Sequence, residues 1–216
     1  MDKETLVANF NKIKSVAGDV EIVPASKTRD IETIEFVSSL GVSTFGENRV
    51  QEWLSKKSAD VEFDFIGRLQ TNKVKYLVGE VRYISSVDRI ELAEEISKYA
   101  SRKGIVQDVL IELNMGREEV KGGIFPENLS EFAELLRGLR GVSLKGIMTV
   151  MPITDDRRYL EKLYKEARSA LDELQVSCPR ATVYSGGMSS DYDIAVACGA
   201  TSIRPGRALF GDRVYK

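Results

Sequence analysis

Short apolar runs alternate with helical patterns along the chain. Apolar residues at positions 6, 7, 10, 13 and 16 recur at helical spacing and predict an amphipathic helix near the start. Helical patterns also occupy the segments 88–104, 126–140 and 157–174, where Asp88 is predicted to cap the first and Pro126 to open the second. The apolar runs that predict strands are eight in number: 21–26, 42–47, 63–67, 81–86, 108–114, 143–150, 182–187 and 202–206.

This alternation predicts one (β/α)8 TIM barrel over residues 1–216, preceded by an extra N-terminal helix. No Pro/Gly-rich linker divides the chain. A doubly wound open sheet is the alternative, because pattern alone does not close a sheet. In a barrel the C-terminal ends of all strands share one mouth, where barrel enzymes carry their chemistry. The polar and adjoining residues expected there are Lys27, Asn48, Arg68, Ser86, Asn114, Met148, Thr149, Ser185 and Arg204.

Composition removes several classes of function. Lys and Arg number 31 against 33 Asp and Glu, so the net charge of -2 predicts neither nucleic acid nor an anionic membrane as partner. The chain has no histidine, the commonest zinc ligand and general base, and Cys178 and Cys198 match no metal or disulfide spacing, so we expect no metal site. No run approaches the roughly 18 apolar residues of a membrane helix. The charged N-terminal segment is unlike a signal peptide, which predicts a cytoplasmic protein.

Two glycine-containing turns follow the last two strands. "YSGGMSSD", residues 184–191, ends a strand in two glycines and is expected to place Ser189 as a helix N-cap, with Asp191 in the first turn. "SIRPGRALFG", residues 202–211, leads from a strand through Arg204 into a short helix. Each turn alone is also compatible with an ordinary capped strand-to-helix connection. Side by side, they predict a phosphate cup of backbone N–H groups and hydroxyls.

Lys27 ends the first strand, next to the eighth in a closed barrel. A lysine half-desolvated at a barrel mouth is a nucleophile toward carbonyls, whereas a solvated loop cation is the bland alternative. Together with the two turns it fits a ligand that carries both a phosphate and an aldehyde, pyridoxal 5'-phosphate, held as a lysine imine. Arg204 then becomes the partner of the pyridine nitrogen, where a permanent cation disfavours ring protonation and makes the ring a poor electron sink.

Longer motifs carry a resemblance to a known family. "VPASKT", "FGENRVQE", "FIGRLQTNKVK", "LNMGREEVKGG", "GIMTVMP" and "YSGGMSSDYDIAVACGATSIRPGRALFG" resemble the pyridoxal phosphate homeostasis proteins, the YggS/PROSC family, which is itself similar to the barrel domain of alanine racemase. The resemblance implies covalent binding of pyridoxal phosphate and a role in vitamin B6 and amino-acid homeostasis, without an established catalytic reaction. It runs from about residue 20 to the end.

Carried over by position, the resemblance implies specific site residues. Lys27 falls on the imine lysine, Arg204 on the pyridine-nitrogen partner, and Ser185 with the backbone of Gly206 and Arg207 on the phosphate site. Asn48 in "GEN" and Met148 in "GIM" are expected to line the ring.

The chain departs from the family pattern at four positions. Asp64 and Arg68 stand where the family commonly has histidine, which puts any proton transfer there in doubt, and Gly186 replaces a bulkier residue, which predicts a looser cup. Arg207 replaces a frequent threonine and is expected to keep the backbone contact and lose the hydroxyl one. Lys121 in a charged flap is a further candidate near the cofactor, with a solvated loop as the alternative.

Three functions remain in play at this stage. We expect a monomeric carrier of pyridoxal phosphate, whose further partners are amino acids or apoenzymes that need the cofactor. The alternative is a small amino-acid racemase, which needs an acid/base on each face of the substrate carbanion. Alanine racemase supplies the second from an additional β domain, which this chain is too short to carry. A phosphosugar barrel enzyme would use the same turns, with Lys27 attacking a sugar carbonyl as in an aldolase.

Overall fold

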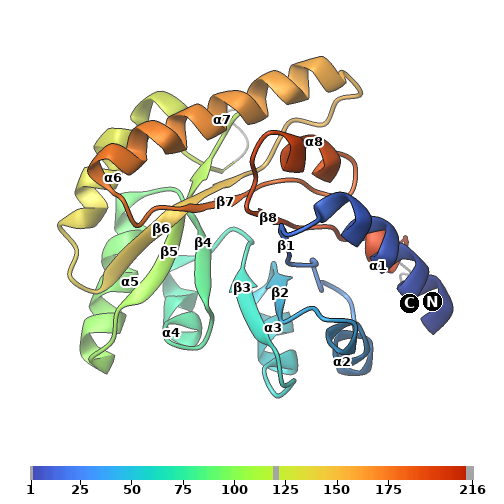
Figure 1. Cartoon of the computed structure of the whole chain (residues 1–216). Helices are drawn as coiled ribbons and strands as arrows, with labels where there is room; N and C mark the ends of the chain where they lie inside the picture. Colours follow the sequence, from blue (N-terminus) through green and yellow to red (C-terminus); the bar gives the residue numbers. More distant parts are fainter. Residues whose placement is uncertain (1, 119–121, 213–216) are drawn as a thin grey trace.

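Eight parallel strands form one sheet that nearly closes into a barrel, with helices on its outside (Figure 1). The computed structural model describes residues 2–118 and 122–212. The strand order is β1-β8-β7-β6-β5-β4-β3-β2. The strands are β1 (Glu21–Ile22), β2 (Thr44–Glu47), β3 (Glu62–Phe65), β4 (Tyr83–Val87), β5 (Gln107–Leu113), β6 (Val142–Thr149), β7 (Val183–Ser185) and β8 (Ser202–Ile203).

The helices alternate with these strands. They are α1 (Lys3–Ala17), α2 (Ile31–Ser39), α3 (Val50–Lys56), η1 (Thr71–Lys73), α4 (Val74–Leu77), α5 (Ile90–Lys103), η2 (Pro126–Asn128), α6 (Leu129–Arg137), α7 (Arg157–Ser177), α8 (Tyr192–Ala197) and α9 (Arg207–Phe210). The (β/α)8 barrel with an additional N-terminal helix, predicted from the alternation, is therefore confirmed.

The barrel closes between the segment that follows β1 and β2. Ala25 and Gly46 form an isolated parallel bridge, in which the Gly46 N–H donates to Pro24 O at 2.8 Å and the Ser26 N–H donates to Gly46 O at 2.9 Å. This bridge brings the residues after β1 beside the end of β2. Lys27, the next residue, is thereby fixed at the mouth between the first and second strands.

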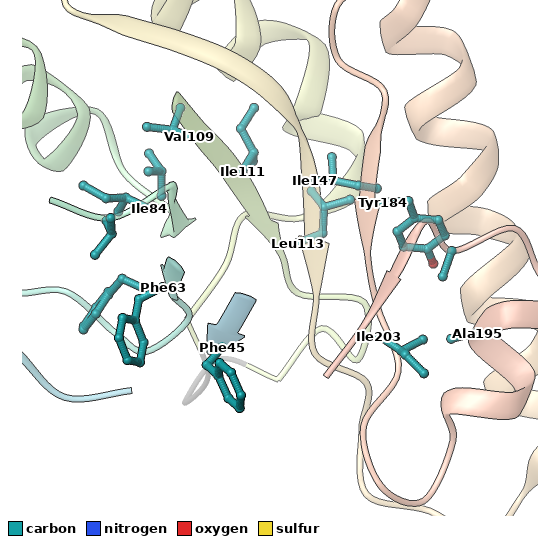
Figure 2. Close-up of a cluster of buried hydrophobic side chains, with 14 of the residues drawn as sticks. Phe45, Phe63, Ile84, Val109, Ile111, Leu113, Ile147, Tyr184, Ala195 and Ile203 are labelled. Atoms are coloured by element: carbon teal, nitrogen blue, oxygen red, sulfur yellow. The ribbon is translucent and has the colours of Figure 1, made fainter. Parts of the chain in front are cut away.

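Apolar side chains from the strands form the core. Val109, Ile111 and Leu113 of β5 are fully buried, as is Ile147 of the neighbouring β6. Figure 2 shows them gathered with side chains of the other strands and with Ala195 of α8. Because parallel strands are covered by helices, both faces of each strand are apolar, which explains why runs rather than alternation marked them in the sequence.

The N-terminal helix α1 packs beside α8 and α9. Its buried face consists of Leu6, Phe10, Ile13 and Ala17, whereas Val16, predicted to belong to that face, is 39% exposed. Ala17 lies about three helical turns after Leu6 and so returns to the buried face, whereas Val16 is rotated away from it. The Asn9 side chain donates to Leu209 O at 3.0 Å, so α1 holds the short helix that follows the second glycine turn.

A second helix prediction is wrong in its cap. Arg89, not Asp88, is the N-cap of α5, and no side chain caps that helix. The Asp88 carboxylate accepts a hydrogen bond from the Arg89 guanidinium at 2.6 Å instead, and this ion pair takes up the acceptor that a cap would need.

Candidate functional site

Lys27 and Arg204 line one cavity at the barrel mouth. The cavity has a volume of about 650 Å³, and its wall also includes Gly206 and Arg207 from the turn after β8 and Ser189 from the turn after β7. Lys27 itself is half-buried, so its alkyl chain is shielded while the side chain still reaches the cavity. A concave pocket with a few convergent polar groups is the usual form of a small-molecule site.

The backbone before Lys27 is held by a buried ion pair. The Lys56 ammonium, at the end of α3, donates to Glu47 Oε1 at 2.7 Å and to Ser26 O at 2.9 Å, and the Ser26 hydroxyl donates to the same Glu47 oxygen at 2.8 Å. The two charged side chains are only 6% and 0% exposed. This group of Ser26, Glu47 and Lys56, together with Glu52, is called the Lys56 clamp below.

The clamp also fixes the backbone after Lys27. The Thr28 N–H donates to Glu52 Oε2 at 2.7 Å, and Thr28 has a φ of 66°, which is unfavourable for a β-branched residue. Burial works to raise the pKa of the Glu52 carboxyl, but the Thr28 N–H and the Lys56 cation outweigh it and hold that pKa below its ordinary value. A strained backbone conformation persists only where surrounding contacts hold it in place. The contacts of the clamp therefore fix the turn at Lys27.

The two glycine turns are joined by one hydroxyl. Ser189 Oγ accepts hydrogen bonds from the N–H groups of Gly206 and Ala208, both at 3.0 Å. In the described part of the chain, the Arg207 N–H between them has no hydrogen-bond partner. Two N–H groups converging on one oxygen, with a third beside them, form the kind of cradle that binds phosphate oxygens.

Asp191, and not Ser189, is the N-cap of α8, so that prediction is wrong. The Asp191 carboxylate is buried and accepts from the Met188 N–H at 2.6 Å and from the Tyr164 hydroxyl at 2.9 Å. Because Asp191 closes the turn in this way, the Ser189 hydroxyl is released to reach across to the turn after β8. Gly187 in the same turn has a φ of 90°, and a Cβ there would lie 2.7 Å from the Ala195 side chain.

Arg204 joins the ends of three strands. Its guanidinium donates to Ser185 Oγ at 2.6 Å and to Thr149 O at 2.7 Å, and its backbone N–H donates to Gly187 O at 2.8 Å. Arg204 is only 4% exposed. Burial lowers the pKa of its guanidinium, while Tyr164 and other nearby acidic groups act in the opposite direction. Arginine nevertheless remains a cation under all ordinary conditions.

Four predicted site residues come together and three do not. Lys27, Arg204, Gly206 and Arg207 share the 650 Å³ cavity. Ser185 lies behind Arg204, buried and bonded to it, and outside the cavity wall. Met148 is fully buried on β6, and Asn48 lines a separate cavity. Lys121 lies outside the described residues. The roles assigned to these seven residues remain predictions.

The departures from the family pattern have distinct surroundings. Asp64 accepts from the Arg82 guanidinium at 2.9 and 2.7 Å, and Arg82 also pairs with Glu21 at the start of β1. Burial raises the pKa of Asp64, against the effect of Arg82. This ion pair therefore joins the starts of β1 and β4 to Asp64 within β3. Arg68 lines the same separate cavity as Asn48.

Gly186 lies close to three side chains. A Cβ at this position would lie 3.0 Å from Thr149 Oγ1 and 3.2 Å from the rings of Tyr164 and Tyr184. A larger residue here would need these neighbours to move, and the looser cup expected from the sequence remains a prediction.

Glu112 is a titratable group that the sequence pattern did not single out. It lies on β5, and burial together with the Asp88 carboxylate raises its pKa to about 7, while Arg204 and Arg68 oppose that rise. Carboxyl groups with pKa values near neutrality are suited to proton transfer, although Glu112 does not line the 650 Å³ cavity. Glu112 is the second-to-last residue of β5, and this position near a strand end is the sequence signal that could have marked it as a site candidate.

No group of His, Cys, Asp or Glu residues that could hold a metal ion occurs in the described ranges. Within the same ranges, none of the helices combines the length and the apolar character needed to span a bilayer.

The barrel and its cup define a domain of the alanine racemase type. The family model for the N-terminal domain of alanine racemase matches residues 1–214. An alanine racemase from Clostridium difficile has the same fold, with a TM-score of 0.80 at 18% identity, over 99% of this chain and 57% of that one.

Relatives with higher sequence identity indicate a particular family within this class. The pyridoxal phosphate homeostasis protein of Aquifex aeolicus is 46% identical over 203 residues, which make up 90% of this chain and 88% of that protein. PipY of Synechococcus elongatus, solved with PLP bound, has a TM-score of 0.86 at 31% identity, over 95% of this chain and 100% of that one. The chain belongs to the family of the pyridoxal phosphate homeostasis proteins.

Proposed function

We propose that this protein binds pyridoxal 5'-phosphate through Lys27 and acts in vitamin B6 and amino-acid homeostasis as a carrier without catalysis of its own. The observation that carries the proposal is the shared cavity: an amine, a guanidinium and an N–H cradle line one space of about 650 Å³. Membership of the family and the PLP-bound structure of PipY support the same ligand.

The residues present fit the chemistry of that cofactor. The N–H groups of Gly206 and Ala208 already donate to the Ser189 hydroxyl oxygen, so the open N–H of Arg207 between them and the Ser189 hydroxyl proton are the donors available to a phosphate. The bonds from Arg204 to Ser185 and Thr149 use two of five guanidinium N–H groups, so others can meet a ring nitrogen. Bound pyridoxal phosphate supplies an aldehyde and an electron-accepting ring. Lys27 supplies the amine that condenses with that aldehyde and releases water.

The remaining residues favour holding the cofactor over using it. Arg204 places a permanent cation where a ring nitrogen would otherwise take up a proton, which weakens the ring as an electron sink. Among the described lining residues there is no tyrosine or cysteine, and the one aspartate, Asp212, is 91% exposed at its side chain. The hydroxyls of Tyr164 and Tyr184 are buried and bonded elsewhere. A second acid/base for racemisation is therefore missing from this wall.

The proposal also covers the cellular compartment and the binding partners of the protein. Both cysteines are free in the structure, as is usual in a reducing compartment, and we place the protein in the cytoplasm. Amino acids and apoenzymes that need the cofactor are the proposed further partners, and a monomer is the proposed state.

Borohydride trapping tests the binding. The purified protein is incubated with pyridoxal phosphate, reduced, digested and mapped by peptide mass, with absorbance recorded before reduction. We expect a pyridoxyl group on Lys27 and none in Lys27→Ala. An adduct confined to other lysines, or no adduct at saturating cofactor, would falsify the proposal.

Chiral chromatography separates the carrier from the racemase. L-alanine and other L-amino acids are incubated with stoichiometric loaded protein beside Lys27→Ala. We expect no D-isomer above that formed by free pyridoxal phosphate, since each missing proton-transfer group typically costs ~10²–10⁴-fold in rate. Repeated turnover that depends on Lys27 would make the protein a small racemase.

A further inference from the structure

A second cavity lies at the C-terminal ends of β2 and β3. It has a volume of about 840 Å³ and is formed by the residues that follow β2 and β3, together with Arg89 at the start of α5. The two cavities share no lining residue. The proposed cofactor site therefore leaves this space unused.

The described wall of this cavity, called the basic cavity below, contains four cations and no acidic residue. They are Arg49, Arg68, Lys73 and Arg89. Arg89 is committed to Asp88 at 2.6 Å and to Leu69 O at 2.7 Å. Within residues 2–118 and 122–212, the side chains of the other three make no hydrogen bond or ion pair. On a chain of net charge -2, three such cations at one concave site form a local excess of positive charge.

Two of the arginines occupy helix positions that disfavour a cation. Arg49 is the N-cap of α3 and Arg89 is the N-cap of α5, and neither helix has a side-chain cap. The N-terminus of a helix carries a partial positive charge and unpaired N–H groups, so acidic or hydroxyl residues are preferred there. Placing arginine at both starts gives up a side-chain capping bond, although Glu52 and Glu91 still provide an acidic residue in the two first turns. Conflicts of this kind between local preference and structure are expected at functional sites.

Side-chain amides complete the wall. Asn48, Gln51, Gln70 and Asn72 line the cavity. The Asn48 Oδ1 atom is buried and has no hydrogen-bond partner in the described part of the chain. Buried polar atoms are normally paired, so the Asn48 amide has an unused acceptor, and rotation of its side chain would bring either the oxygen or the N–H groups to a ligand in the cavity.

We propose that the basic cavity binds a small phosphate-bearing anion with two or more negative charges, separate from the cofactor site. Guanidinium groups match phosphate oxygens in a bidentate manner, and Lys73 adds a point charge. The volume lies within the range of small-molecule sites. A multiply charged anion also balances the positive charge of Arg49, Arg68 and Lys73, which an apolar or cationic ligand does not.

Pyrophosphate is the probe for this site. ¹⁵N-labelled protein, loaded with cofactor and reduced so that the first cavity is filled, is titrated with pyrophosphate, and amide shifts are followed by NMR. We expect saturable shifts at residues 48–51 and 69–73 and little change at Ser189 and Gly206. Saturable shifts confined to the Ser189 cradle, or none at all, overturn the proposal. The same titration on unloaded protein keeps the result independent of the cofactor proposal.

Charge-matched variants locate the effect. Arg68→Gln and Lys73→Gln are each expected to weaken pyrophosphate binding by roughly tenfold or more, because each removes a charge-assisted hydrogen bond. Arg140→Gln is the control, since this exposed residue lies before β6, at the opposite end of the barrel, and loses the same charge. Equal weakening in all three variants would mean a long-range effect of net charge and overturn the site.

The class of ligand is tested by competition. Succinate, a dianion without phosphate, is expected to bind at least tenfold more weakly than pyrophosphate, since carboxylates lack the tetrahedral set of oxygens that several cations can share. Equal affinity for succinate contradicts a phosphate site. Single-stranded RNA that binds at residues 48–51 and 69–73 and is not displaced by pyrophosphate contradicts a small-molecule site.

Discussion

The Lys56 clamp predicts a large loss of stability from one substitution, Lys56→Met. The methionine keeps much of the length of the lysine side chain but removes the ammonium that bonds to Glu47 at 2.7 Å and to Ser26 O at 2.9 Å. Glu47 then remains as a carboxylate with a side chain that is 0% exposed. It keeps hydrogen bonds from the Ser26 hydroxyl and the Asn48 N–H, at 2.8 and 3.2 Å, but no cation balances its charge.

The magnitude follows from that burial. Removing one partner of a buried ion pair typically costs about 3–5 kcal/mol, because the charge left behind has lost its hydration without compensation. A domain of this kind has roughly 5–15 kcal/mol of stability in total. The substitution is therefore expected to take away a large fraction of the free energy of unfolding. The double variant Glu47→Gln/Lys56→Met removes both charges and is expected to recover part of the loss.

Urea unfolding followed by circular dichroism measures the effect. Lys165→Met is the matched control, because Lys165 forms an ion pair with Glu161 at 2.6 Å while both side chains are at least half exposed. Exposed pairs of this kind contribute little, so this variant should unfold at the wild-type midpoint. Equal midpoints for Lys56→Met and Lys165→Met, or a double variant no more stable than Lys56→Met, would refute the reasoning.

Three further predictions follow from individual residues. Glu112→Gln tests the pKa of about 7. In the wild type the raised pKa stabilises the fold below pH 4.5, and this contribution is lost as the pH rises through 7. The variant should therefore have a higher free energy of unfolding than the wild type above pH 7. A shift from 4.5 to about 7 bounds the gain at about 3 kcal/mol, read from urea midpoints at pH 5 and 8; parallel curves would contradict it. Ser185→Ala should cost about 1.5–3 kcal/mol of stability, because the charged Arg204 loses a hydrogen-bond partner. The affinity for pyridoxal phosphate should stay within about twofold of the wild type. A larger loss of affinity at unchanged stability would make Ser185 a phosphate ligand. Thr28→Gly should relieve about 1–2 kcal/mol of strain at a φ of 66°, offset by about 0.5–1 kcal/mol of chain entropy. Thermal unfolding should therefore occur at or slightly above the wild-type midpoint. A clearly lower midpoint would show that the threonine side chain itself stabilises the turn.

The fold could be predicted because its signals repeat. Each of the eight apolar runs contains or overlaps a strand of the barrel, even where the strand is only two residues long, as in β1 and β8. The alternation favoured a barrel but did not by itself exclude an open sheet, because closure depends on hydrogen bonds between residues 24–26 and Gly46 that no pattern encodes. Caps could not be predicted from side-chain type alone: Asp88 and Ser189 both have suitable side chains, but Asp88 pairs with the neighbouring Arg89, and Ser189 accepts hydrogen bonds from the turn after β8.

The site could be predicted only in part. Lys27, Arg204, Gly206 and Arg207 lie at strand ends or in glycine turns, so position alone brought them to one cavity. The clamp that holds Lys27 escaped notice because Glu47 and Lys56 are charged residues in a buried place, nine positions apart on a strand and a helix. Only the pairing of Glu52 with Lys56, four residues apart on one helix, carried a local signal.

Arg204 links the stability of the mouth to its proposed lack of catalysis. Its guanidinium bonds to Ser185 and Thr149, and its backbone to Gly187, so one residue connects the ends of β6, β7 and β8. A neutral or acidic residue there would make the ring of a bound pyridoxal phosphate a better electron sink. The same change would leave the Thr149 carbonyl without its donor in a buried place, which costs stability. Catalytic power could thus not be gained at this position without loosening the cup that holds the cofactor.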